Sequence, residues 1–97
     1  IFLIKNFQLN NLEEKEFQLV LKLSQFQDIV DKSYNDLNPA IIANYAYQLA
    51  QIFNEFYHSC PVLHSGKELF RSALVESFRQ VMKNSLYLLG IDVLEEM

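Results

Sequence analysis

The sequence predicts an all-α fold, a helical bundle of about four helices, on three observations. Apolar residues recur at intervals of three and four along most of the chain, which is the spacing of one face of a helix. Only two glycines and two prolines interrupt the 97 residues, so long regular elements are expected. Hydrophobic residues make up 51% of the chain and aromatic residues 13%, which is enough for a packed core. We therefore expect a single α-helical domain over residues 1–97.

Residues 1–9 form an apolar run, IFLIKNFQL, without a clean period. The run is compatible with a short strand or with the end of a helix. Because the chain opens on Ile1 rather than on methionine, we expect it to be a fragment of a longer protein. The run would then be the stub of a preceding helix, packed against residues outside this chain.

The first complete helix is expected over about 12–24. Asn11 followed by Glu14 is a variant of the capping box, which marks the start of a helix. Glu13, Glu14 and Glu16 place acid in the first turn, where the helix dipole favours it, and we interpret them as solvated.

A second helix is expected over about 26–36, because Ser24 followed by Gln27 repeats the capping signature. The pattern thus predicts a break near 24–27. The apolar residues of the two helices would share one face: Leu12, Leu19, Leu23, Phe26 and Val30.

The start of the central helix, about 39–59, is marked most clearly. Asn38 is a good N-cap and Pro39 suits the first helical position. The face expected to be buried consists of Ile42, Ala46, Leu49, Phe53 and Phe56. The opposite, solvated face consists of Asn44, Gln48, Gln51, Glu55 and His58.

Between these two faces runs a third stripe of the same helix: Tyr47, Ala50, Asn54 and Tyr57. Two interpretations are open. The tyrosines could be half-buried against a neighbouring helix, or they could contact a partner, because a ring with a polar tip suits either environment.

A loop over 60–66 should follow, since Pro61 ends the central helix and Gly66 relaxes the backbone. Ser65 with Glu68 is a further capping box and opens a final helix of about 67–89, which Gly90 would end. Its buried face is expected to hold Phe70, Leu74, Phe78, Val81 and Leu88. Its solvated face is expected to hold Ser72, Glu76, Arg79 and Lys83.

Charge and cysteine content restrict the class of partner. The net charge is −4 and the isoelectric point about 5.0, which argues against binding DNA or RNA through phosphate contacts alone. Local recognition of bases stays possible. The single Cys60 cannot form an internal disulfide, so a reducing, cytoplasmic location is expected. No apolar run reaches the roughly 18 residues of a membrane span, so no membrane partner is expected.

Catalytic chemistry finds little support in the residues. His58, Cys60 and His64 lie within seven residues, but structural zinc needs four ligands and no second pair is present. A nucleophile formed by Cys60 and a histidine would lack an orienting third group. No glycine-rich phosphate loop occurs. The pattern therefore favours a non-catalytic module without metal or cofactor.

Arg71 is a cation on an apolar stripe of the final helix. A charge in such a place needs a partner, because an unpaired buried charge is costly. It could extend to solvent or pair with a carboxylate of another helix. Alternatively, it could border a pocket and contact an anionic or aromatic ligand such as a nucleotide. The apolar members of the stripe are Val75, Phe78, Met82 and Leu89.

The order and spacing of several segments resemble the C-terminal DALR anticodon-binding domain of class I arginyl-tRNA synthetases. The resemblance runs from Leu12 to Met97 and rests on NYAYQLAQIFNEFYHSCPVL, FRSAL, VMKNSLYLLGI and the final Met97. It implies a helical bundle that binds the anticodon loop of arginine tRNA. It also implies a parent arginine–tRNA ligase, whose catalytic domain uses ATP and Mg and attaches arginine to tRNA. No HIGH-like or KMSK-like signature of that domain occurs in these residues.

The resemblance also implies roles for individual residues. Tyr57 matches the tyrosine that borders the anticodon pocket of the family, and Met97 matches a terminal methionine that packs into it. Arg71 and Leu74 match the motif that names the family, where the arginine shapes a helix junction rather than reading a base. Tyr47 would extend the same surface.

Lys83, Asn84 and Leu86 fit the Lys-Asn-Gly-Leu segment of the family, with Ser85 in place of the glycine. The tail departs further, because Leu94 and Glu96 stand where proline and often arginine are common. Glu96 would remove a positive charge close to RNA.

Three alternatives stay open beside arginine-tRNA recognition. The chain could be the DALR domain of another aminoacyl-tRNA synthetase, such as the β chain of the glycine enzyme, although the ending disfavours it. It could be a helical protein–protein interaction module in which Tyr47, Tyr57 and Met97 form an apolar patch. A stand-alone enzyme comes last. A pocket joining Tyr57 to Met97 would favour RNA recognition, and a continuous apolar groove would favour a protein–protein interaction with a partner helix.

Overall fold

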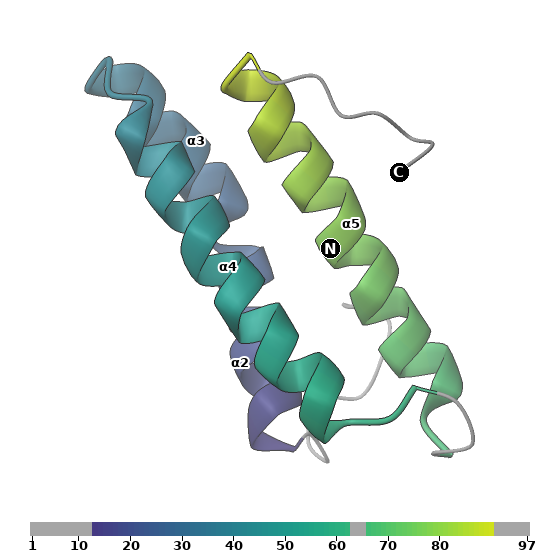
Figure 1. Cartoon of the computed structure of the whole chain (residues 1–97). Helices are drawn as coiled ribbons and strands as arrows, with labels where there is room; N and C mark the ends of the chain where they lie inside the picture. The colour runs from purple at the N-terminus through teal and green to yellow at the C-terminus, as the bar shows by residue number, and fades with distance from the viewer. Residues whose placement is uncertain (1–12, 63–65, 91–97) are drawn as a thin grey trace.

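The computed structural model describes residues 13–62 and 66–90, which form four helical segments and no strand (Figure 1). These segments are α2 (Glu14–Ser24), α3 (Phe26–Asn35), α4 (Ala40–Ser59) and α5 (Glu68–Leu88). The all-α prediction is confirmed, and each observed helix end lies within two residues of the predicted one. The expectations for residues 1–9 fall outside the described residues.

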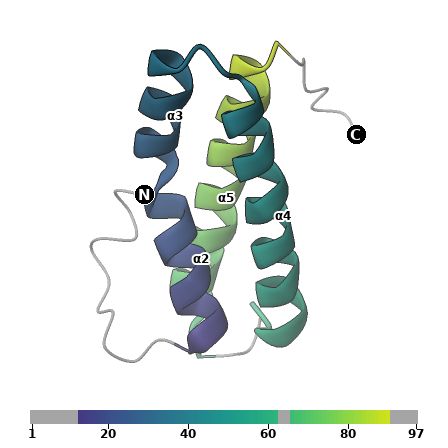
Figure 2. The same cartoon turned by 90° about the vertical axis from the view of Figure 1, so that its left-hand side faces the viewer.

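The four segments are arranged as three rods, because α2 and α3 continue one another with a bend at Gln25 (Figure 2). The bent rod α2–α3 lies along α4, and α5 forms the third rod. The central helix α4 packs against α2, α3 and α5, and α5 also packs against α2. The helix that carries Tyr47 and Tyr57 is thus the one around which the bundle is built.

The start of α2 differs from the prediction. Its N-cap is Glu13, and the capping box joins Glu13 to Glu16, whose carboxylate accepts the Glu13 N–H at 3.0 Å. The predicted box of Asn11 with Glu14 is therefore wrong, and Asn11 itself lies outside the described residues. The interpretation of Glu16 as a solvated residue is also wrong, because its side chain is fully buried.

The break between α2 and α3 is confirmed, but its predicted cause is not. Gln25 occupies the cap position without a side-chain cap, and the Ser24 hydroxyl donates instead to the Leu21 carbonyl at 2.6 Å. Serine readily bonds backward to a carbonyl in the preceding turn, and here this bond replaces the forward cap.

The turn between α3 and α4 combines two terminal motifs. The Asn38 side-chain oxygen accepts the Ala40 N–H at 3.1 Å, and Pro39, with a helical φ of −65°, holds the N-cap position, so α4 begins one residue after the predicted start. On the α3 side, Leu37 has φ +50°, and the N–H groups of Leu37 and Asn38 donate to the carbonyls of Tyr34 and Ser33. This is the Schellman arrangement that ends many helices.

The C-terminal end of α5 agrees with the prediction, whereas its N-cap does not. Gly90 has φ +79° and donates its N–H to Tyr87, as expected of a C′ glycine. At the other end the N-cap position is Lys67 rather than the predicted Ser65, and Ser65 lies outside the described residues.

The core lies where α2, α4 and α5 meet. Its buried members are Leu19, Leu23, Tyr45, Leu49, Phe56, Cys60, Phe70, Leu74 and Val81. Tyr45 escaped the sequence prediction; its ring is buried and its hydroxyl donates to the Lys22 carbonyl at 2.7 Å. Phe53 and Phe78 are only partly buried, and Leu88 is exposed, so its assignment to the buried face is wrong. The predicted solvated faces of α4 and α5 are confirmed.

Candidate nucleic-acid interface

The tyrosine stripe of α4, comprising Tyr47, Ala50, Asn54 and Tyr57, lies on the surface of the molecule. Tyr47 is 67% exposed and its hydroxyl accepts a hydrogen bond from the Gln51 amide at 3.3 Å. Tyr57 is 57% exposed and its ring lies 5.8 Å from that of Phe53, one turn earlier. The interpretation in which both tyrosines are half-buried against a neighbouring helix is therefore not what the structure has.

None of the four residues of the stripe carries a charge. No carboxylate belongs to it, and the adjacent Glu55 is held in an ion pair with Lys15 of α2 at 2.9 Å. Amide side chains accompany the rings, with Asn54 in the stripe and Gln51 beside it. Rings stack on bases, and amides donate to and accept from base edges. The rings and amides of the stripe thus have the chemistry to bind unstacked bases.

Arg71 pairs with a carboxylate of another helix, one of the alternatives that the sequence left open. Its guanidinium is almost fully buried, with Nε donating to the Glu16 carboxylate at 2.7 Å and Nη1 donating to the Pro61 carbonyl at 2.7 Å. Lys67 approaches the other oxygen of Glu16 at 3.1 Å, and Glu13 lies 3.6 Å from Nη2. Arg71 therefore ties the start of α2 to the start of α5 and to the loop after α4.

The charges of this buried cluster support one another. Burial by itself raises the pKa of Glu16, but the hydrogen bonds from Arg71, the Glu13 N–H and Lys67 outweigh it, so the pKa lies below its ordinary value of 4.5. Burial lowers the pKa of Arg71 and the bond and charge of Glu16 raise it, with a net rise. Both groups are consequently charged at neutral pH, and the guanidinium is committed within the fold.

Cys60 lies beside this cluster and is buried. Burial raises the pKa of its thiol, which disfavours the thiolate that a nucleophile needs. Its Sγ contacts the Glu13 carboxylate at 3.6 Å, and no histidine contacts it among the described residues. The geometry around Cys60 is therefore that of a core residue.

The described residues offer no arrangement typical of a metal site or of a membrane span. Within 13–62 and 66–90, no three His, Cys, Asp or Glu side chains are placed to share a metal ion, and His64 lies outside these ranges. The same residues form no phosphate-binding loop that would suit ATP with Mg. None of the described helices is both long and apolar enough to cross a bilayer.

Among the described residues, Lys83 and Asn84 lie near the C-terminal end of α5, whereas Tyr57 lies near the C-terminal end of α4, at the opposite end of the bundle (Figure 1). Lys83 and Asn84 are exposed on α5, where the Asn84 side chain accepts from Gln80 at 3.1 Å. Met97 lies outside the described residues, so the predicted pocket joining it to Tyr57 stays a prediction.

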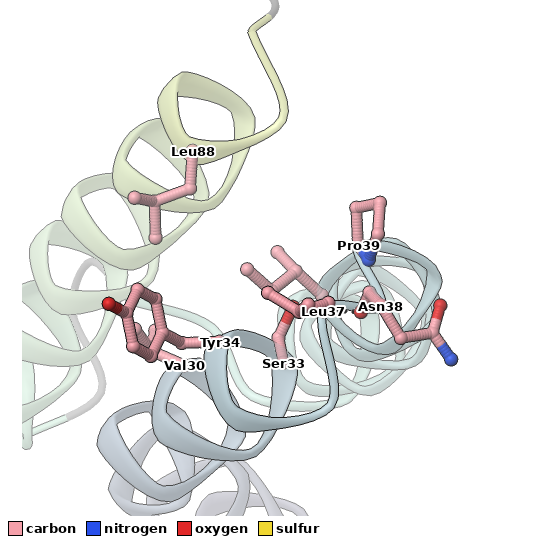
Figure 3. A pocket seen from close by; sticks show the side chains of 8 residues that line it. Val30, Ser33, Tyr34, Leu37, Asn38, Pro39 and Leu88 are labelled. Atoms are coloured by element: carbon pink, nitrogen blue, oxygen red, sulfur yellow. Dashed lines mark hydrogen bonds between the residues drawn. The ribbon is translucent and has the colours of Figure 1, made fainter.

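A groove that the sequence reasoning missed lies at the opposite end of the bundle, between the α3–α4 turn and the last turn of α5 (Figure 3). Its volume is about 360 Å³. The one sequence signal for it was Leu37, an apolar residue in a polar turn. The groove is lined by Val30, Ser33, Tyr34, Leu37, Asn38, Pro39, Ile42 and Leu88.

Comparison with known proteins gives a consistent family. The model of the DALR anticodon binding domain matches residues 2–97. Arginine–tRNA ligase of Pyrococcus abyssi is 40% identical over 97 residues, covering 98% of this chain and 16% of the relative. The corresponding ligase of Pyrococcus furiosus is 41% identical over 98% of this chain, and that of Phocaeicola vulgatus 40% identical over 89%.

The chain spans about 15–16% of the length of these relatives. No solved structure matches it. Because the family model covers almost every residue, the chain belongs to the family of DALR anticodon binding domains.

Proposed function

We propose that this chain recognises the anticodon loop of arginine tRNA, as the anticodon-binding part of an arginine–tRNA ligase acting in the cytoplasm. Membership in the DALR family and the similarity to arginine–tRNA ligases support this role. Attachment of arginine, and the use of ATP and Mg, would belong to a catalytic domain in the same longer protein. The role of this chain would be to bind the anticodon loop and so position the tRNA relative to the catalytic domain.

The observation that carries the proposal is the exposed ring of Tyr57 in a stripe without carboxylates. Anticodon bases are unstacked in a loop, and proteins bind such bases by aromatic stacking and by contacts to their edges. In this proposal Tyr57 stacks on one base, and Tyr47 and the neighbouring amides contact others. Lys83, Asn84 and Met97 are proposed as further contacts.

Arg71 has a different role in this proposal. Its guanidinium already bonds to Glu16 and to the Pro61 carbonyl, so it is poorly placed to read a base. It would act by fixing the junction from which α4 and α5 diverge. This agrees with the junction role that the family resemblance implies for the arginine.

The net charge of −4 sets the expected strength of binding. Phosphate contacts supply much of the affinity of RNA-binding proteins, and an acidic chain makes few of them. We therefore expect weak binding that weakens further with salt. Tight, salt-insensitive binding of this chain to tRNA would contradict the proposal.

The test is fluorescence anisotropy at low salt with a labelled anticodon stem-loop of arginine tRNA and a matched stem-loop with a scrambled anticodon. Tyr57→Ala should lower affinity by roughly 1–3 kcal/mol, the contribution of a base stacked on an aromatic side chain. Removal of Met97 should also weaken binding. Tyr34→Ala is the control, because Tyr34 is also an exposed tyrosine, 78% against 57% for Tyr57, and lies at the other end of the bundle.

Two outcomes would overturn the proposal. Binding that ignores the anticodon would show that the chain does not read the loop. Anticodon-dependent binding that survives Tyr57→Ala would place the RNA site elsewhere on the chain.

One observation favours a second function, a helical protein–protein interaction module. The groove between the α3–α4 turn and α5 is apolar and is bordered by the exposed side chains of Tyr34, Leu37 and Leu88. Exposed apolar surface of this kind suits a partner helix. Two results together would favour this alternative: the chain fails to bind RNA, and it self-associates in a way that Leu37→Asp abolishes.

A further inference from the structure

Three aromatic rings connect α5 to the exposed surface of α4. The rings of Phe78 and Phe53 are stacked, with centroids 3.9 Å apart and planes 6° apart. Phe53 in turn contacts Tyr57, with centroids 5.8 Å apart and planes 27° apart. Both phenylalanines are partly buried, whereas Tyr57 is exposed. We call Phe78, Phe53 and Tyr57 the aromatic column.

The column explains how an exposed tyrosine near a helix end can hold one orientation. An isolated exposed side chain samples several rotamers and loses that freedom when it binds. Phe53 and Tyr57 are four residues apart on α4, the spacing at which side chains on a helix meet. Phe53 is itself restrained by Phe78, which belongs to another helix. The orientation of Tyr57 therefore depends on how α5 packs against α4.

We propose that Phe78 is a positioning residue that orients the Tyr57 ring for stacking on an RNA base. This inference rests on the proposed function and adds a residue that would not itself touch RNA. Phe78 restrains Phe53, Phe53 restrains Tyr57, and the tyrosine meets the base with its ring already oriented. A side chain of α5 thus sets the affinity of a surface on α4.

The competing explanation is that Phe78 only contributes to packing. The two explanations differ in whether the effect of Phe78 passes through Tyr57. A pure packing residue lowers stability and affects binding equally whether or not Tyr57 has its ring. A positioning residue loses its effect on binding once the Tyr57 ring is gone, which a double-mutant cycle measures.

The experiment uses the 97-residue chain, the same anticodon stem-loop and four proteins: the unaltered chain, Phe78→Leu, Tyr57→Ala and the double variant. Phe78→Leu should weaken binding about two- to tenfold, the range that corresponds to one aromatic pair. In the Tyr57→Ala background the same change should have no further effect. Phe78→Tyr keeps the ring and should bind like the unaltered chain.

A matched control separates ring loss from loss of stability. Phe26 is also a partly buried phenylalanine beside a tyrosine, Tyr45, at a centroid distance of 6.0 Å, but it lies outside the column. Phe26→Leu should therefore leave RNA binding unchanged. Circular dichroism on every variant reports whether the helices persist.

A second measurement needs no RNA. The NMR ring resonances of Tyr57 should shift in Phe78→Leu and should return towards their original positions in Phe78→Tyr, whereas Phe26→Leu should leave them in place. If Tyr57→Ala does not affect binding, the proposed function fails while this measurement still reports on the orientation of the ring. If Tyr57 matters for binding but Phe78→Leu acts equally in both backgrounds, or leaves the Tyr57 resonances unmoved, the positioning role is overturned alone.

Discussion

The two ends of the bundle are held by opposite kinds of contact. At one end, the starts of α2 and α5 and the loop after α4 converge on a buried ion pair between Glu16 and Arg71. At the other end, the α3–α4 turn and the last turn of α5 leave an apolar groove, with Leu37 85% exposed (Figure 3). The charged groups of Glu16 and Arg71 are thus buried, whereas Leu37 and Leu88 are exposed, the reverse of the usual distribution.

The two kinds of contact differ in how strictly they fix the relative positions of the helices. Hydrogen bonds are directional, so the Arg71 guanidinium can fix the relative positions of three chain segments at once. Apolar contacts are not directional and leave the groove end less specified. Tyr57, near the C-terminal end of α4, lies towards the polar junction, which suits the base-stacking role that we propose for it.

The largest expected effect comes from breaking the junction. Arg71→Met leaves the carboxylate of Glu16 buried without its guanidinium, and removing one member of a buried ion pair costs about 3–5 kcal/mol. We expect the free energy of unfolding to fall by this order, measured by urea denaturation with circular dichroism.

The matched control for Arg71→Met is Arg79→Met, two turns later on the same helix. Arg79 pairs with Glu76 at 2.6 Å, but both side chains are more than half exposed. Exposed pairs contribute at most about 1 kcal/mol, so this change should be nearly silent. Equal losses in the two variants would mean that the junction does not hold the fold in the way described.

Acid should weaken the junction before it weakens the groove end. The pKa of Glu16 is lower in the folded protein than its ordinary value of 4.5, so the folded state binds the proton less readily than the unfolded state. The stabilisation by the Glu16 carboxylate is then complete above pH about 4.5 and is lost as the pH falls through the folded pKa.

Denaturation measured between pH 7 and pH 3 should therefore show a decline below pH about 4.5 that is flatter in Glu16→Gln. Glu76→Gln is the control, because Glu76 also has a lowered pKa through its bond to Arg79 but is exposed to solvent. An acid decline that is the same in Glu16→Gln and in the unaltered chain would assign it to other carboxylates.

The helices were predictable from the sequence because their signals are local. Asn38 with Pro39 and the glycine at 90 mark helix ends by properties of single residues, and the structure has both ends within one residue of where they were expected. Glu16 could not be placed in the same way. In the sequence it is one of several acids in a first turn, and only a partner 55 residues away reveals that it is buried.

In the candidate site, too, features with a local sequence signal were predictable and contacts between distant residues were not. The helical spacing of α4 separated the tyrosine stripe from the buried and the solvated faces, but it left open whether Tyr47 and Tyr57 are half-buried; the structure has both exposed. The stacking of Phe53 on Phe78 joins two helices, and no pattern within either helix indicates it. Leu88 was misplaced for a related reason, since the helical spacing of α5 continues past the point where other helices cover it.

The smallest expected effect lies at the groove end and has the opposite sign. Leu37 occupies the C′ position of a Schellman motif with φ +50°, where a residue with a Cβ is strained by about 1–2 kcal/mol. Glycine removes the strain and loses about 0.5–1 kcal/mol through its greater freedom in the unfolded chain. Leu37→Gly should therefore raise the free energy of unfolding by about 0.5–1 kcal/mol, measured by urea denaturation.

Gly90 supplies the reciprocal control for Leu37→Gly, since it holds the same position at the end of α5 with φ +79°. A Cβ at Gly90 would meet no atom within 4 Å, so Gly90→Ala tests the backbone term alone and should destabilise by about 1 kcal/mol. If Leu37→Gly lowers stability instead, the exposed leucine contributes more through the groove than its backbone conformation costs. Apolar packing at the groove would then stabilise the α3–α4 turn by more than the strained backbone of Leu37 costs. The two ends of the bundle would therefore differ less in stability than their contacts suggest.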